Sequence, residues 1–233
     1  MSHLQAVVFD LYETLITLFD PAWKPCPSIA ERLGVDEAAF DEAWRQSRNR
    51  RGRGLIDCVA ALREIGVVLG RTPSEAVIRQ LYEERLLDRA KPFLQIESEI
   101  LQMVRDLRAI VKMGLISNVA PEEVAAWDGC ALAPYFDVVV FSYQVGLMKP
   151  EAQIYHLACE RLGVSPDVAM FVGDGASREL EGAASAGLAP HWATWFADRW
   201  PTGVRSPETC ESSARFPRLK SPGELVDVVR RAK

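Results

Sequence analysis

Short apolar runs rich in β-branched residues recur along the chain, and turn residues bound each of them. Such runs are typical of buried strands, and amphipathic helical patterns separate the last three of them. The runs lie at 6–9, 114–116, 138–141 and 170–172, and the expected helices lie at 96–110, 151–162, 178–186 and 224–231. Strands that alternate with helices predict an α/β fold with a parallel sheet.

A long segment with helical patterning separates the first predicted strand from the others. Its apolar side chains recur at helical spacing in three places, at Phe40 and Trp44, at Val59, Leu62 and Ile65, and at Val77, Leu81 and Leu86. An excursion of this length between two strands of one sheet is more naturally a small helical domain than a structureless loop. We therefore predict a Rossmann-like core of residues 1–16 and 93–233, with an inserted α-helical cap domain of residues 17–92.

The composition is that of an ordinary globular protein, with 48% hydrophobic and 25% charged residues. A net charge of -5 disfavours nonspecific binding to nucleic acid or to an anionic membrane, and leaves a small anionic substrate open. The amino-terminal residues lack the pattern of a secretory signal or a membrane span, and the five cysteines form no C-x-x-C pair. We expect a cytoplasmic protein with reduced thiols, as a monomer or a homodimer.

Polar side chains follow the carboxyl ends of the predicted strands. These ends carry Asp10, then Ser117 with Asn118, then Lys149 shortly after the third strand, and Asp174. Because the carboxyl ends of parallel strands meet at one crevice, we expect these side chains to lie close together. A carboxylate nucleophile, a hydroxyl donor, a fixed cation and a second carboxylate suit displacement at an anionic centre.

The same segments resemble the motifs of the haloacid dehalogenase superfamily. The similar segments are Phe9-Asp10-Leu11-Tyr12-Glu13-Thr14-Leu15, Leu115-Ile116-Ser117-Asn118, Lys149-Pro150 and Phe171-Val172-Gly173-Asp174. The position of the helical insertion also resembles the cap of this superfamily. The resemblance implies a hydrolase in which Asp10 is the nucleophile and Lys149 counters the charge around it. It also implies that Thr14 and Ser117 hold the substrate anion, with Asn118 as a further substrate-binding residue.

The resemblance to the phosphatases of this superfamily implies a bound Mg²⁺ ion. Its ligands would be Asp10, the backbone carbonyl of Tyr12 and Asp174, and Glu179 is a candidate for orienting a metal-bound water. Two carboxylates that face a phosphate dianion repel it strongly in a dry site, and a divalent cation with oxygen ligands offsets that charge. The implied reaction is hydrolysis of a small phosphorylated metabolite through an aspartyl-phosphate.

Tyr12 keeps other activities open. Most phosphatases of the superfamily have an aspartate at this position, which protonates the leaving oxygen and then activates water, whereas tyrosine resembles the 2-haloacid dehalogenases. In that reaction Arg45 would help accept the halide, and a metal-independent aspartyl ester would form. Asp174 and Glu13 are instead typical of the phosphatases. A third possibility is a binding or regulatory protein with little turnover.

A cationic run, Arg48-Asn49-Arg50-Arg51-Gly52-Arg53, lies in the predicted cap. Arginine makes planar contacts with phosphate and carboxylate groups, so the run is a candidate for holding a phosphate-bearing substrate. The alternative is a hydrated helix surface, which is the usual place of such runs. The aromatic residues Trp192, Trp195, Phe196 and Trp200 are expected to pack near the last strand.

Overall fold

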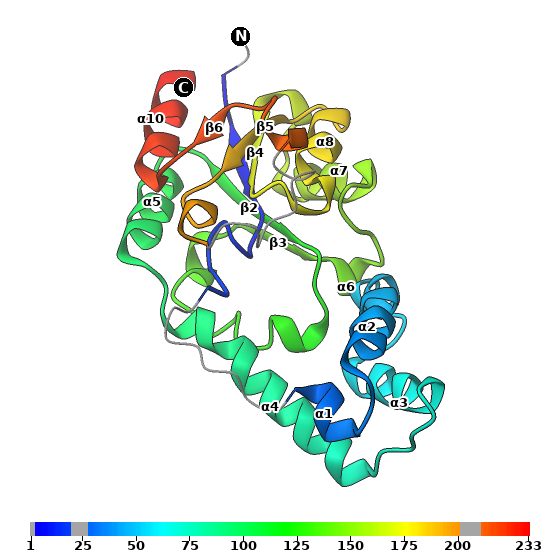
Figure 1. The fold of residues 1–233 in the computed structure, drawn as a ribbon. Helices are drawn as coiled ribbons and strands as arrows, with labels where there is room; N and C mark the ends of the chain where they lie inside the picture. Colours follow the sequence, from blue (N-terminus) through cyan, green and yellow to red (C-terminus); the bar gives the residue numbers. More distant parts are fainter. Residues whose placement is uncertain (1–2, 20–27, 201–210) are drawn as a thin grey trace.

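Parallel strands form a sheet at the centre of the larger part of the molecule (Figure 1). The computed structural model describes residues 3–19, 28–200 and 211–233. Within them, six strands lie in the order β3-β2-β1-β4-β5-β6, and every neighbouring pair is parallel. The strands are β1 (Ala6–Phe9), β2 (Lys112–Ser117), β3 (Val138–Phe141), β4 (Ala169–Gly173), β5 (Ala189–Ala193) and β6 (Arg218–Leu219).

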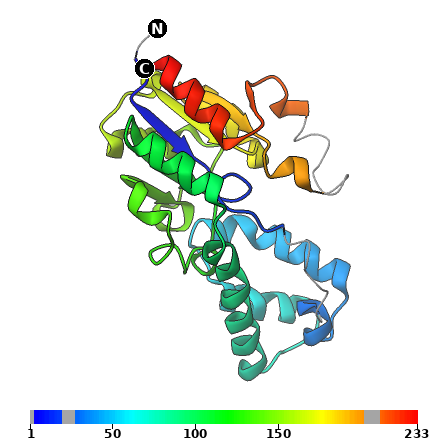
Figure 2. The same cartoon turned by 90° about the vertical axis from the view of Figure 1, so that its left-hand side faces the viewer.

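Helices cover both faces of this sheet (Figure 2). On one face lie α5 (Ser98–Arg108) and α10 (Pro222–Ala232), and on the other lie α7 (Ala152–Leu162) and α8 (Glu179–Ser185). The side chains of β1 point alternately to the two faces of the sheet. Val7 and Phe9 join the core under α5 and α10. Ala6 and Val8 join the α7 and α8 core. Since both faces are covered, β1 is apolar throughout, and the predicted Rossmann-like α/β core is confirmed.

The four predicted strands all form, and each lies within two residues of its expected ends. The structure adds β5 and β6, which the sequence pattern did not indicate. Strand β5 carries Pro190 and His191 and is half-exposed over most of its length, so it lacks a buried strand's apolar run. Strand β6 has only two residues. Shorter elements are α6 (Ser142–Val145) and the 3-10 turns η1 (Pro121–Glu123), η2 (Ala133–Tyr135), η3 (Pro166–Val168), η4 (Ala176–Arg178) and η5 (Ala197–Arg199).

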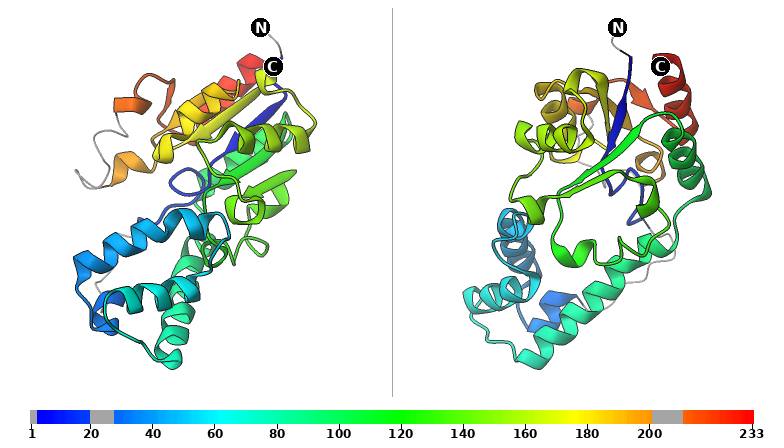
Figure 3. Two further views of the ribbon diagram at one scale, coloured as in Figure 1. Left: turned by 90° about the vertical axis from the view of Figure 1, so that its right-hand side faces the viewer. Right: turned by 180° about the vertical axis from the view of Figure 1, so that it is seen from behind.

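A second group of helices lies between β1 and α5 in the sequence and beyond the carboxyl ends of the strands in space (Figures 1 and 3). These helices are α1 (Ile29–Leu33), α2 (Glu37–Gly52), α3 (Cys58–Val68) and α4 (Glu75–Leu94). Asp36, Asp57 and Ser74 cap α2, α3 and α4 by accepting a backbone N–H bond, which fixes where each helix begins. We refer to α1 to α4 as the cap.

The cap has a small apolar core of its own, which includes Phe40, Leu62 and Leu81. The helical spacing seen in the sequence is therefore that of buried helix faces. The boundary expected after residue 92 lies inside the last turn of α4, which continues to Leu94. Residues 20–27 of the predicted cap lie outside the described residues.

Two further expectations concern cysteines and membranes. Cys58, Cys130 and Cys159 are free and buried, and Cys26 and Cys210 lie outside the described residues. In the part of the chain that the structure describes, no helix has both the length and the apolar character needed to cross a membrane.

Candidate active site

A cavity of about 570 Å³ lies where the carboxyl ends of the strands face α2 and α4 of the cap. Asp10 directly follows β1, Ser117 ends β2, and Asp174 directly follows β4. Lys149 reaches the same cavity from the segment between α6 and α7. The parallel topology therefore gathers four of the predicted residues from distant parts of the sequence around one space.

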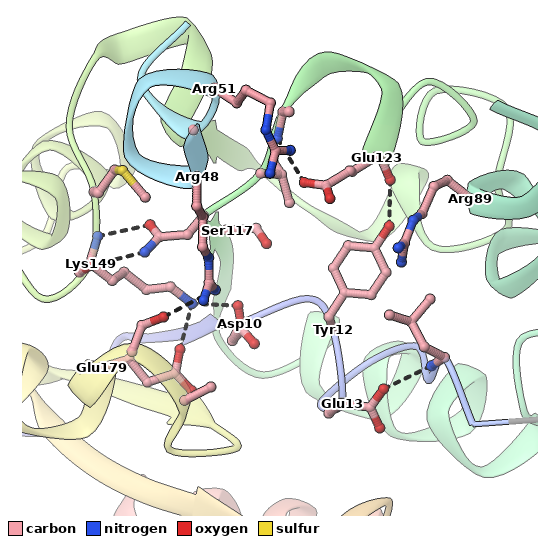
Figure 4. Close-up of a pocket in the computed structure, with 18 of the residues that line it drawn as sticks. Asp10, Tyr12, Glu13, Arg48, Arg51, Arg89, Ser117, Glu123, Lys149 and Glu179 are labelled. Atoms are coloured by element: carbon pink, nitrogen blue, oxygen red, sulfur yellow. Dashed lines mark hydrogen bonds and ion pairs between the residues drawn. The ribbon is translucent and has the colours of Figure 1, made fainter. Parts of the chain in front are cut away.

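Lys149 forms a buried ionic cluster with two carboxylates (Figure 4). Its Nζ atom pairs with Oδ1 of Asp10 and, at 2.5 Å, with Oε2 of Glu179. Burial alone would lower the pKa of the ammonium group, but the charges of Asp10 and Glu179 outweigh burial and raise that pKa above its ordinary value. The lysine is therefore a fixed positive charge beside Asp10.

Three carboxylates crowd this part of the cavity. Oxygen atoms of Asp10, Asp174 and Glu179 all lie within 4.8 Å of one another, and all three residues are buried. Burial raises the pKa of Asp10, Lys149 lowers it in part, and the charge of Asp174 raises it again. Burial and the charge of Asp10 also raise the pKa of Glu179. Lys149 therefore leaves the negative charge of the group incompletely compensated, and a divalent cation with oxygen ligands fits the chemistry of this donor set.

The segment after β4 explains how Glu179 comes so close. A Cβ atom on Gly173 would lie 2.2 Å from Oε1 of Glu179, so only glycine leaves room for that carboxylate. The backbone N–H of Gly175 donates to the same Oε1 atom at 3.0 Å. Both oxygens of Glu179 therefore have protein partners, and its contact with a metal-bound water stays a prediction.

Asn118 and Ser117 lie side by side at the end of β2 but have different surroundings. The Nδ2 group of Asn118 donates to the carbonyl oxygen of Lys149, and the backbone N–H of Lys149 donates to Oδ1, both at 2.8 Å. Asn118 thus fixes the backbone that carries the lysine, and its expected substrate contact stays a prediction. Ser117 is buried and lines the cavity, where its hydroxyl is placed to meet an anion.

Two predicted site residues are not brought to the cluster. Thr14 is fully buried and is not among the residues that line the cavity, because the turn over residues 11–16 folds back on itself. Within the described part of the chain, its Oγ1 atom has no hydrogen-bond partner. Arg45 lies at the exposed mouth of the cavity and pairs with Glu42 on its own helix. The expected contact of Thr14 with a substrate anion therefore stays a prediction, and Arg45 lies at the rim of the cavity.

Neither Tyr12 nor Glu13 is placed to act as a general base. The Tyr12 hydroxyl donates to the backbone carbonyl of Glu123 at 2.5 Å, and its ring packs edge-on against Phe93. Burial and the charge of Glu123 raise the pKa of Tyr12 well above its ordinary value of 10.0. Glu13 adopts a left-handed backbone with φ of 58°, and its carboxylate accepts the N–H of Leu18 at 2.8 Å. Both side chains are thus already engaged with the protein.

Arginines of the cap contact the two glutamates of η1. Arg85 Nε donates to Glu122 at 3.1 Å, and its NH2 group donates to Glu123 at 2.9 Å. The guanidinium carbon of Arg51 lies 3.8 Å from the ring centre of Trp44, and Arg51 is also 3.9 Å from Glu122. These ion pairs hold α2 and α4 against the core across the cavity.

Sequence reasoning missed the part played by α4 and η1. Arg85 and Arg89 are four residues apart in the sequence, which places them on the same face of α4 and was the available signal. The cationic run of α2 divides between two surroundings. Arg48 and Arg51 line the cavity, whereas Arg50 pairs with Glu64 on the outside of the cap.

Comparisons with known proteins agree with this arrangement. The sequence model of the haloacid dehalogenase-like hydrolases matches residues 4–187. The human N-acylneuraminate-9-phosphatase (Homo sapiens) is 30% identical over 204 residues, which cover 81% of each chain. The phosphoserine phosphatase of Thermus thermophilus is 30% identical over 53% of this chain, and the match spans about half (49%) of that enzyme. The fold resembles the crystal structure of a 2-haloacid dehalogenase from Pseudomonas syringae pv. Tomato DC3000, with a TM-score of 0.63, 21% identity, and coverage of 99% of this chain and 100% of that one.

Proposed function

The chain belongs to the haloacid dehalogenase-like hydrolase family, and we propose that it is a magnesium-dependent phosphatase that acts on a small phosphorylated metabolite. The observation that carries this proposal is the buried group of Asp10, Asp174 and Glu179, whose negative charge Lys149 offsets only in part. A phosphate dianion would add further negative charge, and a divalent cation offsets it. Relatives named as phosphoserine and N-acylneuraminate-9-phosphatases support the same activity.

Asp10 is the proposed nucleophile. Its carboxylate oxygen would attack phosphorus and form an aspartyl-phosphate while the alcohol of the substrate leaves, and water would then cleave the acyl phosphate. Lys149 would hold Asp10 in place and stabilise negative charge on the phosphoryl oxygens, and the Ser117 hydroxyl would donate to one of them. Asp10, Asp174 and the carbonyl of Tyr12 would hold Mg²⁺, which when bound would neutralise charge on the transferring group.

The metal requirement gives the first test. We expect the chain to release phosphate from members of a phosphate monoester panel in MgCl₂, and to lose nearly all of this activity with EDTA. Asp174→Asn should lower kcat/KM at least about 100-fold, because the loss of a metal ligand removes several kcal/mol of charge stabilisation. Asp128→Asn, at an exposed position that does not line the cavity, serves as the control. Activity that EDTA leaves unchanged would contradict the proposal.

Dehalogenation is a second candidate, because Tyr12 occupies the position of the phosphatases' second aspartate. This reaction requires halide release from a short 2-halo acid in the presence of EDTA. It also requires a contribution from Arg45, whose side chain is 66% exposed and paired with Glu42. Halide release that is lost in Arg45→Ala would establish dehalogenation in place of phosphoryl hydrolysis.

If the chain is a phosphatase, we expect slow turnover, because Tyr12 stands where a general acid-base residue is needed. Tyr12→Asp should raise kcat for phosphate release by about 100-fold, the usual contribution of a positioned acid or base. Tyr12→Asn is the matched control, because it frees the same space and breaks the same hydrogen bond to Glu123 without adding a base. Equal rates for the two variants would contradict an acid-base deficit. If only Tyr12→Asp turns over, the natural chain is the binding or regulatory protein of the third alternative.

A further inference from the structure

Five arginines line the cavity from the cap side, and they differ in what they contact. The five are Arg45, Arg48, Arg51, Arg85 and Arg89. Arg45 pairs with Glu42, while Arg51 and Arg85 pair with Glu122. These three guanidinium groups have their charge offset by the protein. Arg48 and Arg89 do not form such pairs among the described residues, so they are the cations available to an anionic ligand.

Arg89 is the more informative of the two. Its Nε atom is buried and has no hydrogen-bond partner among the residues that the structure describes. Glu123, on the same side of the cavity, already has partners for both oxygens, because its Oε1 accepts from Arg85 and its Oε2 accepts from the backbone N–H of Ala120. A buried guanidinium N–H without an acceptor is costly, so a donor left in this state beside a cavity indicates a ligand atom that accepts from it.

The two free arginines lie in different parts of the cavity (Figure 4). Arg48 extends from α2 toward Asp10 and Lys149, and its NH2 group lies 3.5 Å from Ser177 on the loop after Asp174. Arg89 points from α4 toward Tyr12, on the other side of that ring from Asp10. A phosphoryl group at Asp10 would thus lie near Arg48 and Lys149, while Arg89 faces a separate position.

We propose that Arg89 binds a second anionic group of the substrate, so that the substrate class is a phosphate monoester that also carries a carboxylate or a second phosphate. This inference rests on the proposed function in taking Asp10 as the site of the transferring phosphoryl group. The ring of Tyr12 lies between Asp10 and Arg89, and Leu18 also lines the cavity, so apolar surface is available to the short carbon skeleton between the two anions. The planar guanidinium of Arg89 suits either anion through paired hydrogen bonds.

Calorimetric binding to the 233-residue chain tests the inference independently of turnover. The Asp10→Asn background prevents hydrolysis, and the ligands are 3-phosphoglycerate and glycerol 3-phosphate, which differ by one carboxylate. We expect 3-phosphoglycerate to bind about 30-fold more tightly, the factor for a charge-assisted hydrogen bond of roughly 2 kcal/mol. Arg89→Met should remove this preference, and Arg79→Met, on the exposed side of the same helix, should keep it. Arg48→Met should weaken the binding of both ligands by the same factor.

A parallel pair, propanediol bisphosphate and propanediol monophosphate, identifies the second group. An Arg89-dependent preference in only one pair assigns that group as carboxylate or as phosphate, and a preference in both pairs assigns it as either anion. Equal affinity within both pairs, binding of none of the ligands, or a preference that survives Arg89→Met would overturn the inference. Phosphate release by the unsubstituted chain without such a preference would leave the phosphatase proposal intact. A preference without any release would contradict that proposal alone.

Discussion

Asp10→Asn is expected to reduce phosphate release at least about 10,000-fold, the largest effect of any single substitution in this chain. The proposed reaction makes and breaks a bond to the Asp10 oxygen, and the loss of a covalent nucleophile removes that route entirely. The amide cannot attack phosphorus, although it fits the same space beside Lys149. The measurement is kcat/KM for the best ester of the panel, with far-ultraviolet circular dichroism to verify that the variant is folded.

A matched control and a trapping experiment make this result specific. Asp128→Asn removes an exposed carboxylate that does not line the cavity, and it should retain normal activity. Mass spectrometry of the chain quenched during turnover should detect a phosphoryl group on the peptide that contains Asp10. If Asp10→Asn keeps more than a hundredth of the activity, or if the phosphoryl group is found elsewhere, Asp10 is not the nucleophile.

The sequence predicted the part of the site that the sheet carries, because topology alone brings it together. Asp10, Ser117 and Asp174 lie at the ends of strands with clear apolar runs, and parallel pairing places those ends at one edge. Lys149 belonged to the same set, because its segment follows shortly after the third predicted strand. Thr14 was implied by the family resemblance but is fully buried and does not line the cavity, since the spacing of a motif does not specify which way a tight turn directs a side chain.

The cap half of the site could not be predicted in the same way. The contacts of Arg85 with Glu122 and Glu123 depend on how α4 rests on η1, and no local pattern encodes the packing of two distant elements. Helical spacing identified the buried faces of the cap and thus its helices. It did not identify Arg89. An arginine on the polar face of a helix is expected to be solvated, and only the structure shows that the core packs opposite this face.

The buried cluster around Asp10 carries a cost in folding. Asp10 and Glu179 have pKa values raised above their ordinary 3.8 and 4.5 by burial, so each takes up protons on folding. A carboxyl group whose pKa is higher in the folded state stabilises the fold below its unfolded pKa, and that stability is lost as the pH rises. The cluster is therefore tolerable at neutral pH only because Lys149 pairs with both carboxylates.

Lys149→Met is accordingly expected to lower both stability and activity. Removing one member of a buried ionic group leaves its partners uncompensated, which costs about 3–5 kcal/mol of unfolding free energy. The loss should be smaller at pH 5 than at pH 8, because Asp10 and Glu179 can be protonated at the lower pH. Phosphate release should fall at least about 1,000-fold, because the charge beside the nucleophile is removed. Urea unfolding at the two pH values and steady-state kinetics measure these effects.

Magnesium links this prediction to the proposed metal site. If Asp10 and Asp174 hold a divalent cation, MgCl₂ should restore part of the lost stability of Lys149→Met, because a cation that binds only the folded state stabilises it by mass action. Lys91→Met, which removes a surface lysine paired with the exposed Asp88, should unfold like the natural chain at both pH values. If the Lys149→Met chain is as stable as the natural one at pH 8, Lys149 does not compensate the charges of Asp10 and Glu179. The electrostatic basis of the proposed reaction would then be lost.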